Sequence, residues 1–358
     1  MLEFGDITIA EAFMSVHSSQ PSPTPSPAPG EELLRVATGY MASACLQAAA
    51  QLRIADLIGE GSRQVAELAR DAKANEDALY RILRALVPFG VFIEAAPRVF
   101  ANTPASEQMR TGTFGSLRDM VIWLSDSFHY RAYGELIHSV KTGQNVMGKL
   151  VGMEAFEYFE KDRAEGEVFN AAMTSFSGMT TAVVLDAYDF RGLGTVADIG
   201  GGHGFFLTSI LEADSNLRGI LFDLPHVVAG AKFLIESRSL GGRCEVVGGD
   251  LFQSVPAANS YTLKHIIHDW EDARAVQILK NCARSMKGNG RVILVEMIVP
   301  RGNEPHFAKL IDIEMLALVS GRERTESDFA ELFAQAGLRL SRIVPTKSPV
   351  CVIEALKA

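Results

Sequence analysis

The stretch Val196-Ala-Asp-Ile-Gly-Gly-Gly-His-Gly-Phe205 decides the fold, because an apolar strand runs directly into a tight turn of glycines. Such a turn requires glycine where φ is positive or where the backbone approaches a ligand closely, since a Cβ atom would not fit. About one βαβ unit further on, Leu221-Phe-Asp-Leu-Pro225 places Asp223 where its carboxylate can accept hydrogen bonds from ribose hydroxyls. Together the two stretches predict a nucleoside site at the edge of an α/β sheet.

The spacing of the glycines discriminates between classes of nucleotide. A dinucleotide site needs G-x-G-x-x-G/A, but Gly200, Gly202 and Gly204 are followed by Phe205 where the last small residue should stand. A P-loop is excluded, because no Gly-Lys-Ser/Thr follows the turn. S-adenosylmethionine (SAM) fits better, since it carries ribose and adenine without phosphates. A glycine turn by itself is equally compatible with an ordinary strand-helix turn, so further residues must decide.

Length and composition narrow the class of protein. The 358 residues allow about two domains, and the formal net charge of −9 argues against a nucleic-acid partner. The four cysteines lie far apart and no histidines cluster at ligand spacing, so we expect neither disulfides nor a metal site. The first residues are acidic and no apolar run reaches the ~18 residues of a membrane span. We therefore expect a globular cytoplasmic protein with no membrane partner.

The chain divides into four regions. Residues 1–30 include a run in which proline alternates with small residues, which predicts a disordered segment. Residues 31–112 open with a helix over about 31–54 and continue as a winged helix. Exposed positions of its second helix mix acids with arginines, so we expect dimerisation rather than DNA binding. Residues 113–190 are predicted to be mainly helical, and their aromatic and methionine side chains form either a plain core or an apolar pocket for an aromatic acceptor.

Residues 191–358 alternate strands with helices, which predicts a mostly parallel α/β sheet covered by helices on both faces. In such a sheet ligands bind at the carboxyl ends of the strands. The expected strands are 195–199, 219–222, 244–247, 260–264, 291–297, 338–344 and 350–355.

Two segments at the carboxyl ends of these strands carry candidate site residues. Asp250 could accept a hydrogen bond from an adenine amino group while Leu251 and Phe252 enclose the ring, unless Asp250 is a helix N-cap. His268 follows the next strand, and an imidazole with its ordinary pKa of about 6.5 can take a proton near neutral pH. The alternative for His268 is a satisfied surface or capping histidine. Asp269 beside it is either an acceptor contact or the N-cap of the next helix.

Two carboxylates favour a catalytic role for His268. Glu296 lies within an apolar strand, where a carboxylate without a partner is costly. Glu323 precedes the helix opened by Thr325, and taken alone it would be a solvated charge among arginines. A carboxylate that accepts from one imidazole nitrogen leaves the other free as a base and stabilises the imidazolium.

Six motifs, in family order, resemble those of the SAM-dependent O-methyltransferases of the plant caffeic acid and animal hydroxyindole type, which also have many bacterial members. They are Asp198-Ile-Gly-Gly-Gly-His-Gly, Phe222-Asp-Leu-Pro, Gly249-Asp-Leu-Phe, Lys264-His-Ile-Ile-His-Asp-Trp, Val295-Glu-Met and Gly321-Arg-Glu-Arg-Thr. The resemblance covers about residues 31–358. It implies a class I methyltransferase fold, which is Rossmann-like, and an amino-terminal winged-helix domain that forms a homodimer.

The resemblance also implies roles for individual residues. His268 matches the general base of the family, and Glu296 and Glu323 match the carboxylates that bracket it. Residues implied to hold SAM are Gly200, Asp223, Asp250, Leu251, Lys264 and Ser177, and those implied to clamp the acceptor ring are Phe169, Met173 and Met315. His203 replaces the commoner threonine of the turn, and the segment before Glu323 is slightly shorter than in plant members, which affects the acceptor pocket rather than the base.

The predicted activity is transfer of the methyl group of SAM to a hydroxyl of a small aromatic acceptor, phenolic or polyketide-like, without a metal. S-adenosylhomocysteine is the second product. Some relatives of this family use the same fold and SAM site for decarboxylation or hydroxylation, which is the first alternative. A SAM-sensing winged-helix regulator and an NAD-dependent dehydrogenase are weaker alternatives, the first disfavoured by the acidic balance and the second by Phe205.

Overall fold

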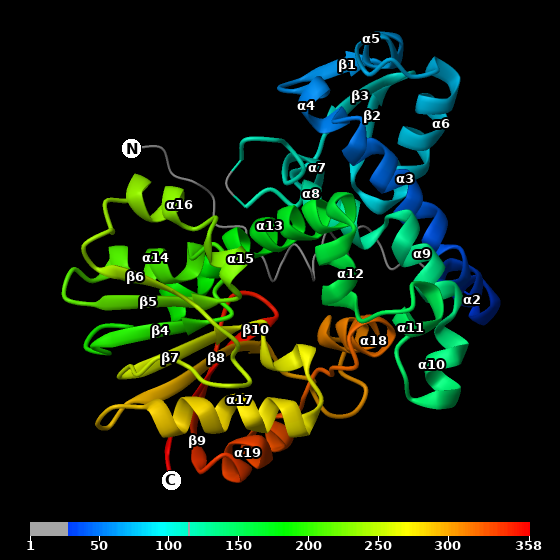
Figure 1. Ribbon diagram of the computed structural model, residues 1–358. Coiled ribbons are helices and arrows are strands. Elements are labelled where there is room, and N and C mark those ends of the chain that lie inside the picture. Colours follow the sequence, from blue (N-terminus) through cyan, green and yellow to red (C-terminus); the bar gives the residue numbers. More distant parts are fainter. Residues whose placement is uncertain (1–27, 114) are drawn as a thin grey trace. The chain divides into compact units, whose positions relative to one another are not determined.

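A computed structural model describes residues 28–113 and 115–358, which form two compact units (Figure 1). The first unit contains the described part of Met1–Arg131 together with Phe159–Met179, and the second contains Ala132–Tyr158 and Thr180–Ala358. The helical segment predicted over 113–190 therefore contributes to both units. The segment predicted to be disordered lies outside the described residues as far as residue 27.

The first unit contains the predicted winged helix. Its elements are α2 (Pro29–Ala37), α3 (Gly39–Gln51), α4 (Ile54–Ile58), β1 (Ser62–Gln64), α5 (Val65–Asp71), α6 (Glu76–Leu86), η2 (Val87–Phe89), β2 (Phe92–Ala96), β3 (Val99–Asn102), α7 (Pro104–Glu107) and α8 (Arg118–Leu124), while α9 (Ser127–Gly134), α12 (Ala155–Lys161) and α13 (Arg163–Ala187) extend into both units. The hairpin β2–β3 and strand β1 form an antiparallel sheet in the order β1-β3-β2. Leu79, Leu83 and Leu86 of α6 recur at helical spacing and are buried in the core of this unit.

The single helix predicted over about 31–54 is broken. Helix α2 ends at Ala37 and α3 begins at Gly39. Between them Thr38 has φ −95° and ψ 0°, and its Oγ1 donates a hydrogen bond of 2.7 Å to the carbonyl oxygen of Leu34. A threonine hydroxyl that bonds to the preceding turn, followed by a glycine of low helix propensity, explains the interruption of the alanine-rich pattern.

The second unit is built on a seven-stranded sheet in the order β6-β5-β4-β7-β8-β10-β9. Its elements are α10 (Leu136–Thr142), α11 (Met147–Leu150), β4 (Thr195–Ile199), α14 (Phe205–Ala213), β5 (Arg218–Asp223), α15 (Pro225–Val228), α16 (Lys232–Ser237), β6 (Cys244–Gly248), β7 (Ser260–Lys264), η3 (Ile267–Asp269), α17 (Asp272–Ser285), β8 (Arg291–Met297), α18 (Ala308–Leu318), α19 (Glu326–Gln335), β9 (Leu338–Pro345) and β10 (Val350–Lys357). Strands β6, β5, β4, β7 and β8 are parallel, and β10 is antiparallel to both of its neighbours.

The strand order reverses between β4 and β7. In an open α/β sheet such a switch point leaves a crevice at the carboxyl ends of the strands, where ligands bind. The glycine turn follows β4 and the loop that carries His268 follows β7. The topology therefore brings the two most informative segments of the sequence to the same crevice.

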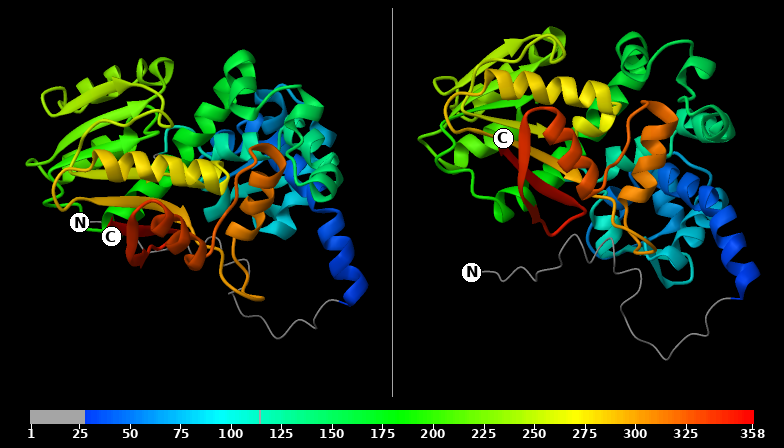
Figure 2. Two further views of the ribbon diagram at one scale, coloured as in Figure 1. Left: turned by 60° about the horizontal axis from the view of Figure 1, so that its bottom comes forward. Right: turned by 90° about the horizontal axis from the view of Figure 1, so that it is seen from below.

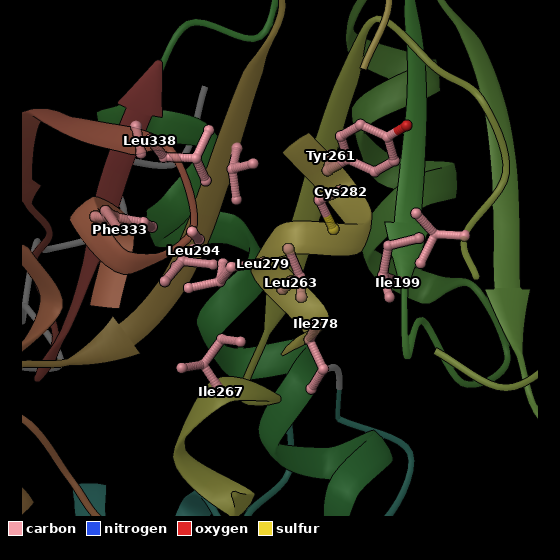
Figure 3. Packing of buried hydrophobic residues seen from close by; sticks show 14 of the residues in the cluster. Ile199, Tyr261, Leu263, Ile267, Ile278, Leu279, Cys282, Leu294, Phe333 and Leu338 are labelled. Carbon is pink, nitrogen blue, oxygen red and sulfur yellow. The ribbon is translucent and has the colours of Figure 1, made fainter. Parts of the chain in front are cut away.

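Helices α17 and α19 cover one face of this sheet (Figure 2). Alternation along β7 directs Leu263 to these helices and Lys264 to the opposite face. Leu279 and Cys282 of α17 pack with Leu263 and Leu294 in the buried layer of Figure 3. This packed layer fixes the positions of β4, β7 and β8, so the residues at their carboxyl ends are held by a rigid sheet.

Among the described helices, α13 alone is long and apolar enough to cross a membrane by length and composition. Core helices of soluble proteins pass the same test, so one such helix is weak evidence for a span. The absence of a membrane partner therefore stays a prediction.

Candidate active site

The glycine turn after β4 has the backbone that the sequence predicted. Gly200, Gly202 and Gly204 have φ angles of 70°, 58° and 84°, which L side chains rarely adopt. A Cβ atom on Gly200 would stand 2.4 Å from Cδ1 of Ile266, so side-chain volume is excluded there as well. Gly202 is half-buried and no atom lies within 4 Å of the place of a Cβ atom there, so a ligand can approach this backbone closely.

Asp223, at the carboxyl end of β5, is tied to that turn. Its Oδ2 accepts a hydrogen bond of 2.8 Å from the N–H of Gly202, and its Oδ1 accepts one of 2.7 Å from the N–H of Leu224. Burial raises the pKa of Asp223, and these two backbone donors oppose that rise. A carboxylate has about four acceptor positions, so two remain for the ribose hydroxyls that the sequence assigned to it.

Asp250 is not a helix N-cap, so that alternative is wrong. Its Oδ1 accepts from the N–H of Phe252 at 2.8 Å, and residues 251–253 form a turn rather than a helix. Asn281 of α17 fixes the same turn, because its Nδ2 donates to the carbonyl oxygens of Leu251 and Phe252 at 2.8 and 3.0 Å. Asn281 is fully buried on the apolar stripe of α17, a signal that sequence reasoning missed.

The predicted adenine-binding side chains lie beside an aromatic group. Leu251 and Phe252 are half-buried. The ring of Phe252 meets Trp270 edge to face at 4.7 Å, and the guanidinium of Arg274 lies 4.1 and 4.3 Å from the centres of these two rings. Such contacts hold Phe252 in one orientation at the edge of the sheet.

The imidazole of His268 lies among three carboxylates. Its Nδ1 is 2.7 Å from Oε1 of Glu323 and 3.6 Å from Oε2 of Glu296, and its Nε2 is 3.5 Å from Oδ1 of Asp269. His268 is 8% exposed and Glu323 is 5% exposed, so the alternatives of a surface histidine and a solvated glutamate are both wrong. Asp269 is not the cap of α17 either, since that position belongs to Glu271.

Glu296 is the most deeply buried of the three carboxylates. Its Oε1 accepts hydrogen bonds from the N–H groups of Ile266 and Ile267 at 3.1 and 2.9 Å. Its Oε2 has no hydrogen-bond partner among the described residues and lies 3.8 Å from Nδ1 of His265. The carboxylate therefore fixes the backbone of the loop and directs its second oxygen towards the imidazoles.

The neighbouring charges and the burial of His268 shift its pKa in opposite directions. Burial lowers the pKa of His268, but the charges of Glu296, Glu323 and Asp269 outweigh it and raise the pKa to about 10. Burial raises the pKa of Glu296 to about 7 and that of Asp269 to about 6, against the attraction of His268. The arrangement therefore stabilises an imidazolium, the state a histidine reaches after it has taken a proton.

A buried arginine holds the two loops of this cluster together. Arg324 donates to the carbonyl oxygens of Ile267 and Trp270 at 2.9 and 2.8 Å, and to Oδ1 of Asp272 at 2.8 Å. The N–H of Arg322 donates to the carbonyl oxygen of His268 at 2.8 Å. Arg324 is 1% exposed, and sequence reasoning assigned it no role.

Lys264 and Asp198 form a second pair of charged groups, on the face of the sheet opposite to α17 and α19; Asp198 is buried and Lys264 is half-buried. Burial lowers the pKa of Lys264 to about 8, against the charges of Asp198 and Glu296. Burial raises the pKa of Asp198 to about 6, although Thr262 donates to its Oδ1 at 2.7 Å. Asp198 was part of the quoted turn motif, but sequence reasoning gave it no role. Its position under the glycine turn supports one in shaping the SAM site.

The residues predicted to clamp the acceptor ring, and Ser177, which is predicted to hold SAM, are divided between the two units. Met315 is buried on α18 of the second unit, while Phe169, Met173 and Ser177 are half-buried in the first unit. The ring of Phe169 stacks on Phe159 at 4.7 Å within that unit. Contacts of Phe169, Met173 and Ser177 with acceptor or cofactor stay predictions.

The fold brings two histidines and a glutamate together, and the expectation of no metal site stays a prediction. His265, His268 and Glu296 each present a possible ligand atom, and these atoms all lie within 4.8 Å of one another. His265 adopts φ 56° at the start of the loop, and this positive φ turns the chain so that both imidazoles face Glu296. Spacing in the sequence alone did not reveal this cluster.

Two family models match the chain. The O-methyltransferase domain matches residues 133–339, and the O-methyltransferase dimerisation domain matches residues 34–111. Phenazine O-methyltransferase PhzM of Lysobacter antibioticus is 40% identical over 90% of this chain and 95% of its own. The mitomycin biosynthesis 6-O-methyltransferase of Streptomyces lavendulae is 33% identical over 96% and 100% of the two chains. The phenazine-1-carboxylate N-methyltransferase of Pseudomonas aeruginosa is 30% identical over 92% and 98%.

Solved structures of methyltransferases are also similar to this chain. The crystal structure of LaPhzM has a TM-score of 0.85 and 39% identity, over 93% of this chain and 100% of its own. The O-methyltransferase NcsB1 of neocarzinostatin biosynthesis, in complex with SAM and 2-hydroxy-5-methyl naphthoic acid, has a TM-score of 0.73 and 32% identity over 90% and 96%. Human N-acetylserotonin methyltransferase in complex with SAM has a TM-score of 0.83 and 26% identity over 94% and 99%.

Proposed function

Since this chain belongs to the SAM-dependent O-methyltransferases that carry an amino-terminal dimerisation domain, we propose that it methylates a hydroxyl of a small aromatic acceptor with His268 as general base. The observation that supports His268 as the base is the contact of its Nδ1 with Oε1 of Glu323 at 2.7 Å. Nδ1 donates its proton to that carboxylate, so Nε2 carries the lone pair that accepts the proton of the acceptor hydroxyl.

SAM supplies a methyl group on a cationic sulfonium, so the protein needs to provide positioning and a base. The acceptor oxygen forms its bond to the methyl carbon as the carbon–sulfur bond breaks, and the hydroxyl proton moves to Nε2 of His268. Glu296 and Glu323 stabilise the imidazolium that results. Gly200, Asp223, Asp250, Leu251, Phe252, Lys264 and Ser177 are the residues proposed to hold SAM.

The three carboxylates keep His268 protonated at neutral pH, and an imidazolium cannot accept a proton. His268 acts as a base once it has lost that proton, either at higher pH or when positive charge enters the crevice and opposes the imidazolium. We propose that the cationic cofactor lowers the pKa of His268 in this way, so that the base becomes neutral when the methyl donor is in place.

Replacing the base tests this proposal. His268→Ala should bind SAM with an affinity close to that of the wild type and lose methyl transfer, measured by calorimetry and by mass spectrometry with labelled SAM and a panel of phenols. General-base catalysis contributes about 10²- to 10⁴-fold to the rate. An alanine variant that keeps its rate would overturn the assignment. The masses of the products also separate methyl transfer from decarboxylation or hydroxylation.

A second candidate function is methyl transfer to a ring nitrogen. It is favoured by the similarity to the phenazine-1-carboxylate N-methyltransferase. A neutral ring nitrogen attacks with its own lone pair and needs no base. His268→Ala would therefore abolish O-methylation but spare N-methylation of an aza-aromatic acceptor.

We propose that the chain forms a homodimer through its first unit. The dimerisation domain matches this part of the chain. Its first two described helices expose the apolar side chains Leu33, Leu34, Val36, Tyr40 and Met41. Leu34→Asp should shift the protein to monomers, which light scattering measures. Leu310→Asp is the control and should not change the oligomeric state, because Leu310 is similarly exposed, at 68% against 66% for Leu34.

A cytoplasmic location and the absence of a nucleic-acid partner stay predictions.

A further inference from the structure

Three side chains that can bind a transition metal meet in the second unit, and one of them is His268, the proposed base. Nδ1 of His265 and Nδ1 of His268 lie 3.8 and 3.6 Å from Oε2 of Glu296. Two ligands at about 2.0–2.1 Å from a tetrahedral Zn²⁺ stand roughly 3.3–3.4 Å apart. Each Nδ1 therefore needs to approach Oε2 of Glu296 by only a few tenths of an ångström, and all three ligand atoms already lie within 4.8 Å of one another.

The second oxygen of Glu296 points to such a ligand independently. Glu296 is fully buried, its Oε1 is taken by two backbone N–H groups, and its Oε2 accepts no hydrogen bond from the described residues. Oε2 of Glu323 also lacks a hydrogen-bond partner among them. Buried carboxylate oxygens without donors are costly, and a cation bound between them removes that cost.

We propose that His265, His268 and Glu296, here called the His–Glu cluster, bind Zn²⁺ or a similar ion such as Co²⁺, and that this ion inhibits the enzyme. Imidazole nitrogen and carboxylate oxygen are preferred ligands of zinc. Glu323 adjoins the cluster through His268 and can supply a fourth ligand. The ion is an inhibitor and not a cofactor, because it occupies the nitrogen through which Glu323 orients the base.

The inhibition follows from the tautomers of imidazole. A metal on Nδ1 replaces the proton that Nδ1 shares with Glu323, and the remaining proton of the neutral ring then resides on Nε2. An Nε2 that carries a proton cannot accept one from the acceptor. This consequence rests on the proposed function, whereas binding of the ion to the cluster does not.

His265 is the residue that tests the cluster. It has no assigned role in methyl transfer, and its φ of 56° lies in the left-handed region that asparagine tolerates. His265→Asn therefore keeps the backbone and removes the imidazole ligand. His138→Asn is a matched control, because His138 lies on α10 and is not part of the cluster.

The experiment titrates Zn²⁺ into the enzyme in chelator-free buffer and follows methyl transfer, with Co²⁺ and its visible absorption as a readout of binding that does not depend on activity. We expect Zn²⁺ to inhibit the wild type and the His138→Asn control, and a chelator to restore their activity. Mg²⁺, which prefers oxygen ligands, should not inhibit them. His265→Asn should keep its activity without zinc and require at least ~10-fold more Zn²⁺ for the same inhibition.

Equal inhibition of His265→Asn and wild type would place the ion elsewhere and overturn the proposal, as would a wild type that shows no Co²⁺ absorption. The two proposals fail separately. If His268→Ala keeps its methyl-transfer rate, the base is wrong. The Co²⁺ spectrum of the wild type and its loss in His265→Asn still decide whether the cluster binds metal.

Discussion

Replacing Glu323 by glutamine isolates the electrostatic effect of one carboxylate on His268, the proposed base. The amide oxygen of a glutamine can still accept the hydrogen bond that Nδ1 of His268 makes with Oε1 of Glu323 at 2.7 Å. The substitution therefore keeps the orientation of the imidazole and removes one negative charge. Because that charge raises the pKa of His268, the pKa must fall in Glu323→Gln.

The size of the change follows from the kind of hydrogen bond that remains. A hydrogen bond to a charged group contributes about 1.5–3 kcal/mol net and a neutral one about 0.5–1.5 kcal/mol, so exchange of the carboxylate for an amide removes about 1–1.5 kcal/mol. At about 1.36 kcal/mol per pKa unit, this loss lowers the pKa of His268 by about one unit from its wild-type value of about 10. The same loss of imidazolium stabilisation lowers the limiting rate by about 10-fold.

The pH profile of kcat/KM measures both effects, since it reports the ionisation of the free enzyme. Neutral imidazole appears at lower pH in Glu323→Gln, so the rising limb of the profile moves to lower pH while its plateau falls. Near neutral pH the two effects offset each other, and the wild-type and variant profiles approach one another. Glu326→Gln, an exposed glutamate in the first turn of α19, is the control and should follow the wild type. A Glu323→Gln profile that superposes on the wild-type profile would refute the reasoning.

Three further predictions concern the turn, the loop and the core. Gly200→Ala places a Cβ atom 2.4 Å from Ile266 at a positive φ, which costs about 1–2 kcal/mol in strain and should weaken SAM binding about 10-fold in calorimetry; unchanged affinity would contradict the assigned contact. Arg324→Met leaves two buried carbonyl oxygens without their donor, so the free energy of unfolding should fall by about 2–4 kcal/mol. The kcat should fall more than the affinity for SAM. A kcat equal to that of the wild type would show that the loop does not need the arginine to position His268. Leu279→Ala, in the core between α17 and the sheet, should lower the free energy of unfolding by about 2–5 kcal/mol in urea at unchanged slope, whereas a loss below 1 kcal/mol would indicate that the core closes the space.

The motifs in the sequence predicted most of the site because each one lies at the end of a strand. Strands β4, β7 and β8 have the predicted bounds, and the glycine turn has the positive φ angles expected from its composition. The alternation of apolar residues and the glycines determine this locally, so no distant contact is needed to recognise it. The pairing of His268 with Glu296 and Glu323 could also be expected, since parallel strands end at one edge of the sheet.

Other features depended on contacts between segments far apart in the chain. Arg324 is buried and donates a hydrogen bond to a backbone carbonyl oxygen of the loop that carries His268, although sequence reasoning assigned it no role. Asn281 fixes the turn of Phe252 from the next helix. In both cases the partner is a backbone carbonyl. Every residue has one, so the sequence does not show which carbonyl accepts the hydrogen bond.

The sequence by itself determined the α/β class and predicted the SAM site and the base, because glycine turns, apolar alternation and a charged residue in an apolar strand are local properties. The tertiary structure decided the ionisation of His268 and the meeting of His265 with Glu296. Both depend on burial and on distances of a few ångströms between side chains from different strands, which the order of residues does not contain.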